Sequence, residues 1–323
     1  MANQYFRFYD DRIAEGITMS GQLVIRDTAK ALDDYMNKVC GTDNEMYSFY
    51  SDTDSCYVTC KKLVDEFFPD KDTAKVVDLL DKIGTDKIEP AIAQAMTKLG
   101  NYTNAFEHKI DFKREVIADK GVFVAKKRYA LNVLDDEGLR LKEPKLKVMG
   151  LEIVRSSTPG PIRESLKEAV RLILTSDEEH LQNFIEEAKA DFKSRSPEDI
   201  AFPRGCNNLL KYQSTADIYQ KGTPIHVRGS LLYNDLLDKQ NLKLKYEKIQ
   251  DGDKIKFLYL KEPNGIHENT IAFVTKLPHE FNLNQYVDYD TIFQKAFIDP
   301  LENIIKPLGW NTEPQASLED LFA

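Results

Sequence analysis

The first hundred residues carry apolar side chains at two spacings, one helical and one strand-like. Apolar positions near helical spacing predict helices over residues 11–40 and 70–105. Between them, short apolar runs at 46–50 and 56–60 flank the polar residues 51–55, which predicts a β-hairpin with a polar tip.

Strand-like patterning returns after residue 105. We expect strands within 108–118, 121–124 and 128–134. The order of helix, hairpin, helix and strands is typical of an α+β domain with an antiparallel sheet and flanking helices.

The pattern changes around Gly150, where we expect a second domain, of mixed α/β character, to begin. Its helices are predicted over about 159–174, 177–194 and 289–305, with strand and loop segments between them. Thr158 is the expected cap of the first of these helices.

Composition and targeting signals narrow the class of protein. The 323 residues are 42% hydrophobic and 30% charged, which is ordinary for a globular chain with room for two domains. No run approaches the roughly 18–20 apolar residues of a membrane helix. Residues 1–7 lack the basic-then-apolar pattern of a signal peptide. We therefore expect a cytosolic protein without a membrane partner.

The four cysteines are too few for a disulfide scaffold in a chain of this length. Cys56 and Cys60 lie four residues apart in a strand-like run, but no second Cys/His pair has the spacing of zinc ligands. We expect buried free thiols, with zinc binding as the alternative.

The net charge of −9 argues at first against a nucleic-acid partner. Basic residues nevertheless gather between Lys113 and Lys147, while acidic residues concentrate elsewhere. A local basic stripe suits a protein that grips a polyanion at one surface. A solvated basic face is the plainer alternative.

Asp52 and Asp54 stand two residues apart on the predicted hairpin tip. Two carboxylates are costly to crowd together unless a cation shares them, and two-metal phosphoryl transfer uses such sites. Asp is also common in turns for conformational reasons, so the turn alone does not decide. An EF-hand is excluded, because Cys56 and Tyr57 stand where oxygen ligands and a glycine belong.

Longer strings resemble known motifs. Tyr50-Ser51-Asp52-Thr53-Asp54-Ser55 resembles the Y-G-D-T-D-S signature of family B DNA polymerases, and Lys126-Lys127-Arg128-Tyr129 resembles their K-K-R-Y primer grip. Further strings look like the passage from palm to thumb in the replicative polymerases of large tailed bacteriophages: Pro144–Glu152, Ser156–Pro159, His226–Gly229 and Tyr233-Asn234.

The resemblance covers almost the whole chain and implies a domain plan. Residues 1–150 would be the C-terminal part of the palm, with the catalytic hairpin and the primer grip. Residues 151–309 would be the thumb, and residues 310–323 a flexible linker with a clamp-binding peptide.

The resemblance also implies residue roles. Asp54 matches the metal-binding aspartate, and two Mg²⁺ ions would be shared with a partner chain. Asp52 matches a less essential carboxylate that tunes the site or holds a water, with a turn-stabilising Asx role as the alternative. Glu115 matches an acidic residue near the metals, with an electrostatic or water-mediated role. Ser51 replaces the usual glycine, which is tolerable if its φ is negative.

The DNA contacts implied by the resemblance fall into two sets. Lys126, Lys127, Arg128 and Tyr129 would face the primer terminus. Candidates for contact with the duplex backbone are Arg155, Ser156, Ser157, Lys211, His226 and Arg228. His226 and Arg228 alternate along an apparent strand and could equally be structural.

Two motifs of the family have no match here: D-x-x-S-L-Y-P and K-x-x-x-N-S-x-Y-G. One aspartate cannot hold two Mg²⁺ ions. We therefore expect the C-terminal subunit of a split DNA-directed DNA polymerase, a nucleotidyltransferase that is inactive alone. An N-terminal chain with the exonuclease, the fingers and the rest of the palm would complete it. The enzyme would act on primer–template DNA and dNTPs in the host cytoplasm.

Alternatives to the split enzyme remain open. An engineered cut or a misread gene start would give the same sequence. A non-enzymatic DNA-binding and clamp-tethering module is a second function class. A stand-alone metal nuclease lacks the additional carboxylates it would need.

The tail has a pattern of its own. Gln315, Leu318, Leu321 and Phe322 fit Q-x-x-L-x-x-L-F, the spacing of peptides that bind a sliding clamp. The alternative is a C-terminal helix that packs on its own domain.

Overall fold

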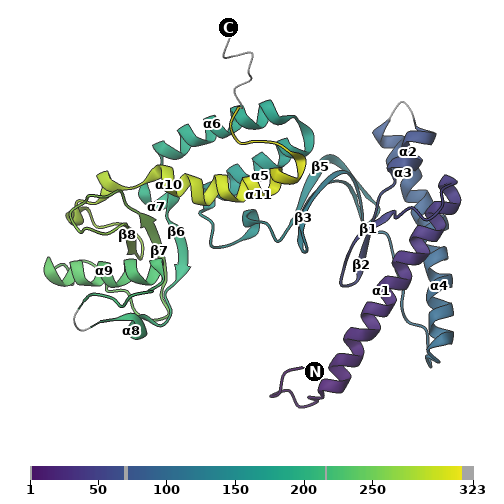
Figure 1. The fold of residues 1–323 in the computed structure, drawn as a ribbon, viewed down its shortest axis with the longest axis horizontal. Helices are drawn as coiled ribbons and strands as arrows, with labels where there is room; N and C mark the ends of the chain where they lie inside the picture. The colour runs from purple at the N-terminus through teal and green to yellow at the C-terminus, as the bar shows by residue number, and fades with distance from the viewer. Residues whose placement is uncertain (1, 69–71, 215–216, 315–323) are drawn as a thin grey trace, which may run out of the picture. The chain divides into compact units, whose positions relative to one another are not determined.

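The computed structural model describes residues 2–68, 72–214 and 217–314, and its fold is α+β, as expected. The chain forms two compact units (Figure 1). Unit 1 comprises Met1–Lys120 and Asn132–Lys145, and unit 2 comprises Gly121–Leu131 and Leu146–Ala323.

Unit 1 is built on a long helix, α1 (Asp11–Cys40), where the sequence predicts it. The carboxylate of Asp10 accepts hydrogen bonds from the backbone N–H groups of Arg12 and Ile13 and caps its first turn. Gly41 ends the helix in the left-handed conformation at φ 60°.

The second half of α1 supports the remaining elements of unit 1. These elements are β1 (Ser48–Asp52), β2 (Ser55–Val58), α2 (Lys61–Phe67), α3 (Thr73–Ile83) and α4 (Glu89–Tyr102). Leu32 packs with Met96 and its neighbours on α4, and Met36 packs with Tyr47 and Leu63. The helix predicted over 70–105 is therefore two helices, α3 and α4, joined by a π-helical turn at Gly84–Ile88.

Three consecutive strands form a sheet in the order β3–β4–β5: β3 (Val116–Ala125), β4 (Arg128–Asp136) and β5 (Leu139–Met149). The expectation of a strand from residue 108 was wrong, because β3 begins only at Val116. Strand β5 was not expected. Most of its residues are exposed or half-buried, so its sequence lacks the apolar alternation of a buried strand.

Unit 2 contains a large single core. Its helices are α5 (Gly160–Thr175), α6 (Glu178–Ser194), α7 (Pro197–Ile200), α8 (Leu209–Tyr212), α9 (Ile225–Lys239), α10 (Tyr289–Phe293) and α11 (Asp299–Ile305). An antiparallel sheet has the order β6 (Phe202–Gly205), β7 (Lys254–Tyr259) and β8 (Thr270–Phe273). A π-helical turn at Gln294–Ile298 joins α10 and α11, which together match the helix predicted over 289–305.

Two local expectations for unit 2 were wrong. The backbone residue that caps α5 is Pro159, while the Thr158 hydroxyl donates instead to the carbonyl of Glu152 at 3.0 Å. His226 and Arg228 lie on helix α9 and not on a strand. Helix α9 packs so closely on β8 that a Cβ on Gly229 would lie 2.8 Å from the backbone nitrogen of Ala272.

Within the described ranges, every helix is too short or too polar to traverse a lipid bilayer.

Candidate active site

The β1–β2 hairpin of unit 1 is labelled in Figure 1. Asp54 lies in the turn between its two strands. Asp52 pairs with Ser55 across the hairpin, so the turn consists of Thr53 and Asp54 alone. The Asp54 N–H donates to the carbonyl of Asp52 at 2.7 Å, and Thr53 takes a left-handed φ of 58°. The turn is thus shorter than predicted, and Asp54 is exposed to solvent.

Asp52 is half-buried and takes part in the bonding of the turn. The Thr53 hydroxyl donates to its carboxylate at 3.0 Å, and the Ser55 hydroxyl donates to its carbonyl at 3.1 Å. Ser51 does not have a positive φ, so its replacement of glycine is accommodated. A turn-stabilising role of Asp52 therefore has contacts to support it.

The base of the hairpin is fixed by Asp33, a residue of α1 that the sequence did not single out. Its carboxylate accepts from the N–H groups of Tyr47 and Ser48 at 2.9 and 2.7 Å, and from the Ser48 hydroxyl at 2.8 Å. These three bonds tie β1 to α1. The only sequence signal was a charged residue beside the apolar positions Leu32 and Met36.

The cysteines near the hairpin are free thiols, but they are half-buried and not fully buried. Burial, and then the neighbouring Cys40, raise the pKa of Cys60 to about 11. Burial also raises the pKa of Cys56. Both thiols are therefore protonated at neutral pH, the form that suits packing better than metal binding.

Glu115 is exposed and directly precedes β3. Its carbonyl accepts from the N–H of Glu137 at 2.6 Å. The side chain of the preceding residue, Arg114, binds Asp81 at 2.6 Å and also pairs with the fully buried Asp135. These contacts hold the entry to β3 and, with it, the backbone of Glu115.

The carboxylates of unit 1 fit part of a magnesium site. Within the described part of the chain, no three His, Cys, Asp or Glu side chains gather closely enough to enclose a metal ion. Mg²⁺ usually takes one or two protein carboxylates and completes its octahedron with water and substrate phosphates. The exposed carboxylate of Asp54 fits that limited demand.

The predicted primer grip lies in unit 2, where β3 turns into β4. Lys126 and Lys127 form the turn and are exposed, with Lys127 at a left-handed φ of 60°. Arg128 is half-buried, and its Nη2 donates to both carboxylate oxygens of Glu152, at 2.8 and 3.0 Å. Tyr129 is 4% exposed and stacks on Phe123, with ring centroids 5.2 Å apart. The two lysines are thus the members of this motif that solvent reaches most freely.

Gly150 packs against the backbone of the turn at Lys127. It has a left-handed φ of 64°, and a Cβ at this position would lie 1.9 Å from the carbonyl oxygen of Lys127. Only glycine leaves room for this contact. The sequence contained Gly150 within a longer string but gave no sign of its partner.

Arg155, Ser156 and Ser157 follow Glu152 in the chain. Arg155 is exposed and lies 3.4 Å from the Glu152 carboxylate, so this carboxylate is shared between Arg155 and Arg128. Ser156 is exposed, and the carbonyl of Ser157 accepts from Arg204 at 3.0 Å.

Lys211, His226 and Arg228 differ in exposure. Lys211 is exposed, with its ammonium 5.5 Å from the ring centroid of Tyr212. Burial, and then the nearby Arg204, lower the pKa of His226, so its imidazole is neutral at pH 7. Arg228 is half-buried, hydrogen-bonds Asn269 and lies 5.7 Å from the centre of the Tyr219 ring. Of the three, Lys211 is the most accessible cation.

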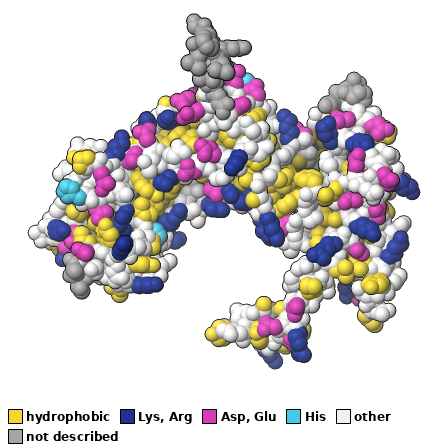
Figure 2. Space-filling view, in the orientation of Figure 1, with side chains coloured by type: hydrophobic (Ala, Val, Ile, Leu, Met, Phe, Trp, Pro, Cys, Tyr) yellow, Lys and Arg dark blue, Asp and Glu magenta, His cyan; other side chains and the backbone are white. Residues whose placement is uncertain are grey.

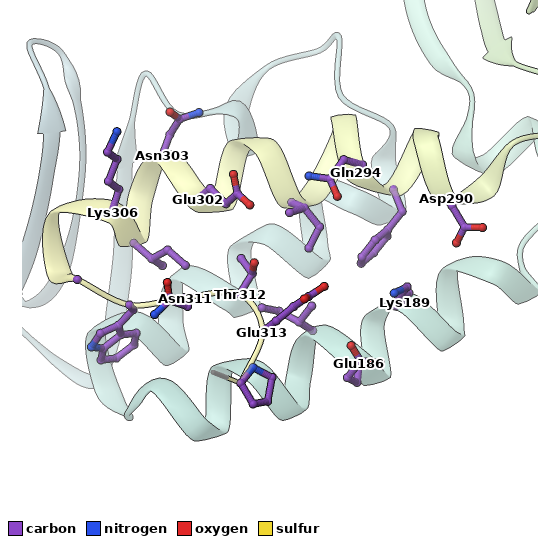
Figure 3. A pocket seen from close by; sticks show the side chains of 17 residues that line it. Glu186, Lys189, Asp290, Gln294, Glu302, Asn303, Lys306, Asn311, Thr312 and Glu313 are labelled. Carbon is purple, nitrogen blue, oxygen red and sulfur yellow. The ribbon is translucent and has the colours of Figure 1, made fainter. Parts of the chain in front are cut away.

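A groove of about 860 Å³ runs between α6 and the helices α10 and α11 (Figure 3). Side chains of both charge signs line it, and none of the predicted site residues is among them. Residues 309–314 border it, and Asn311 is bonded to α6 through Glu178 at 2.6 Å and Gln182 at 3.1 Å. The predicted clamp-binding residues, Gln315, Leu318, Leu321 and Phe322, lie outside the described residues.

Comparison with known proteins gives whole-chain matches. No family model matches the chain. It is 36% identical over 336 residues to the DNA-directed DNA polymerase of Enterobacteria phage T4, and 37% identical over 337 residues to that of Escherichia phage RB69. Each alignment takes in 100% of this chain and 37% of the relative. The chain thus spans little more than a third of these relatives and corresponds to their C-terminal part.

A more distant match points the same way. A DNA polymerase of Methanocaldococcus jannaschii is 22% identical over 307 residues, which cover 94% of the chain and 15% of that protein.

Proposed function

The chain belongs to the family B DNA polymerases of the T4 and RB69 kind, matching their C-terminal region, and on this premise we propose that it contributes to DNA-directed DNA synthesis. It supplies one metal-binding aspartate, the primer grip and the thumb. The observation that carries the proposal is the two-residue hairpin turn, which holds Asp54 exposed at a defined tip.

Asp54 is the proposed protein ligand of Mg²⁺. When bound, the ion would stabilise charge on the nucleotide phosphates and lower the pKa of the attacking hydroxyl. The chain's own part is to present the carboxylate in place, through the three Asp33 bonds at the base of the hairpin and the hydroxyl contacts at the tip. Asp52 and Glu115 would add negative potential without direct ligation.

Lys126 and Lys127 are the proposed first contacts with the primer backbone, because both are exposed in the turn between β3 and β4. Arg128 is held by Glu152 through Nη2 and would bind DNA more fully by exchanging this partner for a phosphate. Tyr129 would act through packing on Phe123, which sets the turn. In the thumb, Lys211, Arg155 and Ser156 are the exposed candidates for duplex contact, and Ser157, His226 and Arg228 are the less accessible ones.

The remaining parts of the catalytic site would come from a partner. The sequence has no match for the family's second metal-binding aspartate motif or its nucleotide-binding helix motif. We propose that an N-terminal chain with exonuclease, fingers and the rest of the palm supplies them, in the host cytoplasm. The tail pattern at Gln315, Leu318, Leu321 and Phe322 would add docking to a sliding clamp.

The test mixes this chain with such an N-terminal chain and measures primer extension with Mg²⁺ and dNTPs. We expect extension in the mixture and none from either chain alone. Asp54→Asn should lower the extension rate about 100-fold or more, since removing even an indirect support of a metal ligand commonly costs 10–100-fold. The control is Asp34→Asn, an exposed carboxylate of α1 that should leave the rate unchanged.

Two outcomes would contradict the proposal. Extension by this chain alone would exclude a split catalytic site, and full activity of Asp54→Asn would remove the metal role. Binding of DNA and clamp without extension in the mixture would favour the tethering module, because the grip lysines and the tail pattern need no metal for that task.

A further inference from the structure

The residues that precede and begin α1 expose an unusual amount of apolar surface. Eight large apolar or aromatic side chains within nineteen residues are exposed: Tyr5, Phe6, Phe8, Tyr9, Ile13, Ile17, Met19 and Leu23. We call this set the N-terminal apolar face. Figure 2 shows hydrophobic side chains open to view along this part of the chain. Apolar side chains gathered in one part of the surface mark an interaction site more often than scattered single residues do.

The helical part of the face is one-sided. At 100° per residue, Ile13, Ile17, Met19 and Leu23 fall within about half of the helix circumference. Thr18 and Gln22, which are also exposed, lie on the opposite side. The pattern is that of an amphipathic helix whose apolar side is left uncovered by the described part of unit 1.

The first half of α1 has little to stabilise it within unit 1. Its buried residues begin only at Thr28, and continue with Leu32 and Met36. Gly16 and Gly21 face open space, with nothing within 4 Å of a Cβ placed there. Each glycine costs a helix roughly 1 kcal/mol relative to alanine, and isolated helices of about 12 residues are marginal in water. A partner on the apolar face would stabilise this segment.

The alignments indicate which partner fits. The whole chain aligns with the C-terminal part of the phage polymerases, so in those relatives the larger remaining part comes directly before the residues that match the N-terminal apolar face. We propose that this face is the docking surface for the N-terminal part of a polymerase of this kind. The inference rests on the proposed function and names the surface through which the two parts join.

A binding experiment without nucleotide, DNA or Mg²⁺ tests the docking surface. The probe is the N-terminal part of the RB69 polymerase that lies outside the alignment, titrated with this chain in a calorimeter. Ile17→Asp with Met19→Asp should weaken binding about 30-fold or more, because two charges would enter an apolar interface. Thr18→Asp with Gln22→Asp is the matched control. It adds the same charge to the same half of α1 and should change affinity less than about threefold.

The same samples serve to measure whether each variant is folded and whether the chain binds a second copy of itself. All four substituted residues are exposed, so both variants should keep the circular dichroism spectrum and the melting temperature of the unmodified chain. Equal weakening by both variants, or no binding of the unmodified chain to the probe, would overturn the proposal. A dimer of this chain in light scattering that Ile17→Asp with Met19→Asp abolishes would overturn it in favour of a second copy. Asp54→Asn should bind normally, so docking and catalysis can fail separately.

Discussion

Lys127 and Gly150 show at residue scale how the turn of the predicted primer grip depends on a position that has no side chain. The carbonyl of Lys127 occupies the place of a Gly150 Cβ, and both residues have left-handed φ values, of 60° and 64°. The backbone path of this turn therefore depends on a glycine more than twenty residues away. The sequence motif predicted a role for the two lysines, but no local spacing could predict the contact between Gly150 and the Lys127 backbone.

Gly150→Ala should destabilise unit 2 and displace the grip. The methyl group meets a backbone oxygen that cannot rotate away, and the left-handed φ adds strain, so we expect a loss of about 2–4 kcal/mol in the free energy of unfolding. Primer extension in the complemented enzyme should fall as well. Gly222→Ala is the control, since Gly222 has φ 85° but nothing within 4 Å of its Cβ position. It should cost only about 1 kcal/mol, as measured by urea unfolding. Equal losses in both variants would contradict the steric argument.

At the scale of elements, Asp135 joins three parts of unit 1. Its carboxylate on β4 pairs with Arg114 ahead of β3 and with Arg140 on β5, and accepts from the N–H of Gly138 at 3.0 Å. Burial would raise the pKa of Asp135, but the Gly138 N–H and the two guanidinium groups outweigh it, so the pKa lies below its usual value. The charged form is thus the one that the folded state favours.

The lowered pKa of Asp135 determines how the free energy of unfolding depends on pH. Because the folded-state pKa is lowered, the stabilisation is present above the unfolded value of about 3.9 and is lost as pH falls through the folded value. Asp135→Asn should cost about 3 kcal/mol at pH 7, since it removes the buried carboxylate of the network and leaves Arg114 and Arg140 with only their more exposed partners, Asp81 and Asp78. The difference from the unmodified chain should shrink below about pH 4.

Asp78→Asn provides the comparison within the same network. Asp78 also pairs with Arg140, at 2.9 Å, but its side chain is 72% exposed. We expect a change of about 0.5 kcal/mol or less. Urea unfolding of both variants between pH 3 and 7 checks the prediction, and a pH-independent loss for Asp135→Asn would contradict it.

Sequence patterning predicted some elements well and others badly. Helices with one apolar stripe and a solvated side, such as α1 and α6, were expected close to their observed bounds. Helix α9 was missed because it is buried on most sides, with Gly229 and Ser230 among its buried positions. The tip of the hairpin was predicted from the apolar runs on either side of it, whereas the Asp33 bonds join residues 14 and 15 positions apart and leave no local pattern.

At the scale of the whole molecule, the candidate residues are divided between the two units. Asp54 and Glu115 belong to unit 1, and Lys126 to Tyr129 belong to unit 2. The strands β3, β4 and β5 each carry the chain from one unit to the other. The family motifs predict that these residues act together, but the sequence alone could not show that they would belong to two different compact units.

The clamp-binding role predicted for the tail is tested by clamp affinity and by product length in the assembled enzyme. Leu318→Ala with Phe322→Ala should lower affinity for the sliding clamp about tenfold or more, since both would be anchors in an apolar pocket. Product length with the clamp present should fall, while short extensions without the clamp stay unchanged. Ser317→Ala with Glu319→Ala alters neighbouring positions outside the pattern and is the control. Unchanged product length for the first pair would exclude the clamp role.

The left-handed conformation of Thr53 has a consequence for attempts to improve the protein. A β-branched residue at φ 58° raises the free energy of the folded hairpin by roughly 1–2 kcal/mol, so glycine or asparagine at this position would favour folding. A selection for thermal tolerance alone would therefore tend to replace Thr53. The threonine hydroxyl that contacts Asp52 would be lost with it, and the variants recovered would be stable proteins with a less ordered tip. Libraries built for stability should keep this codon fixed.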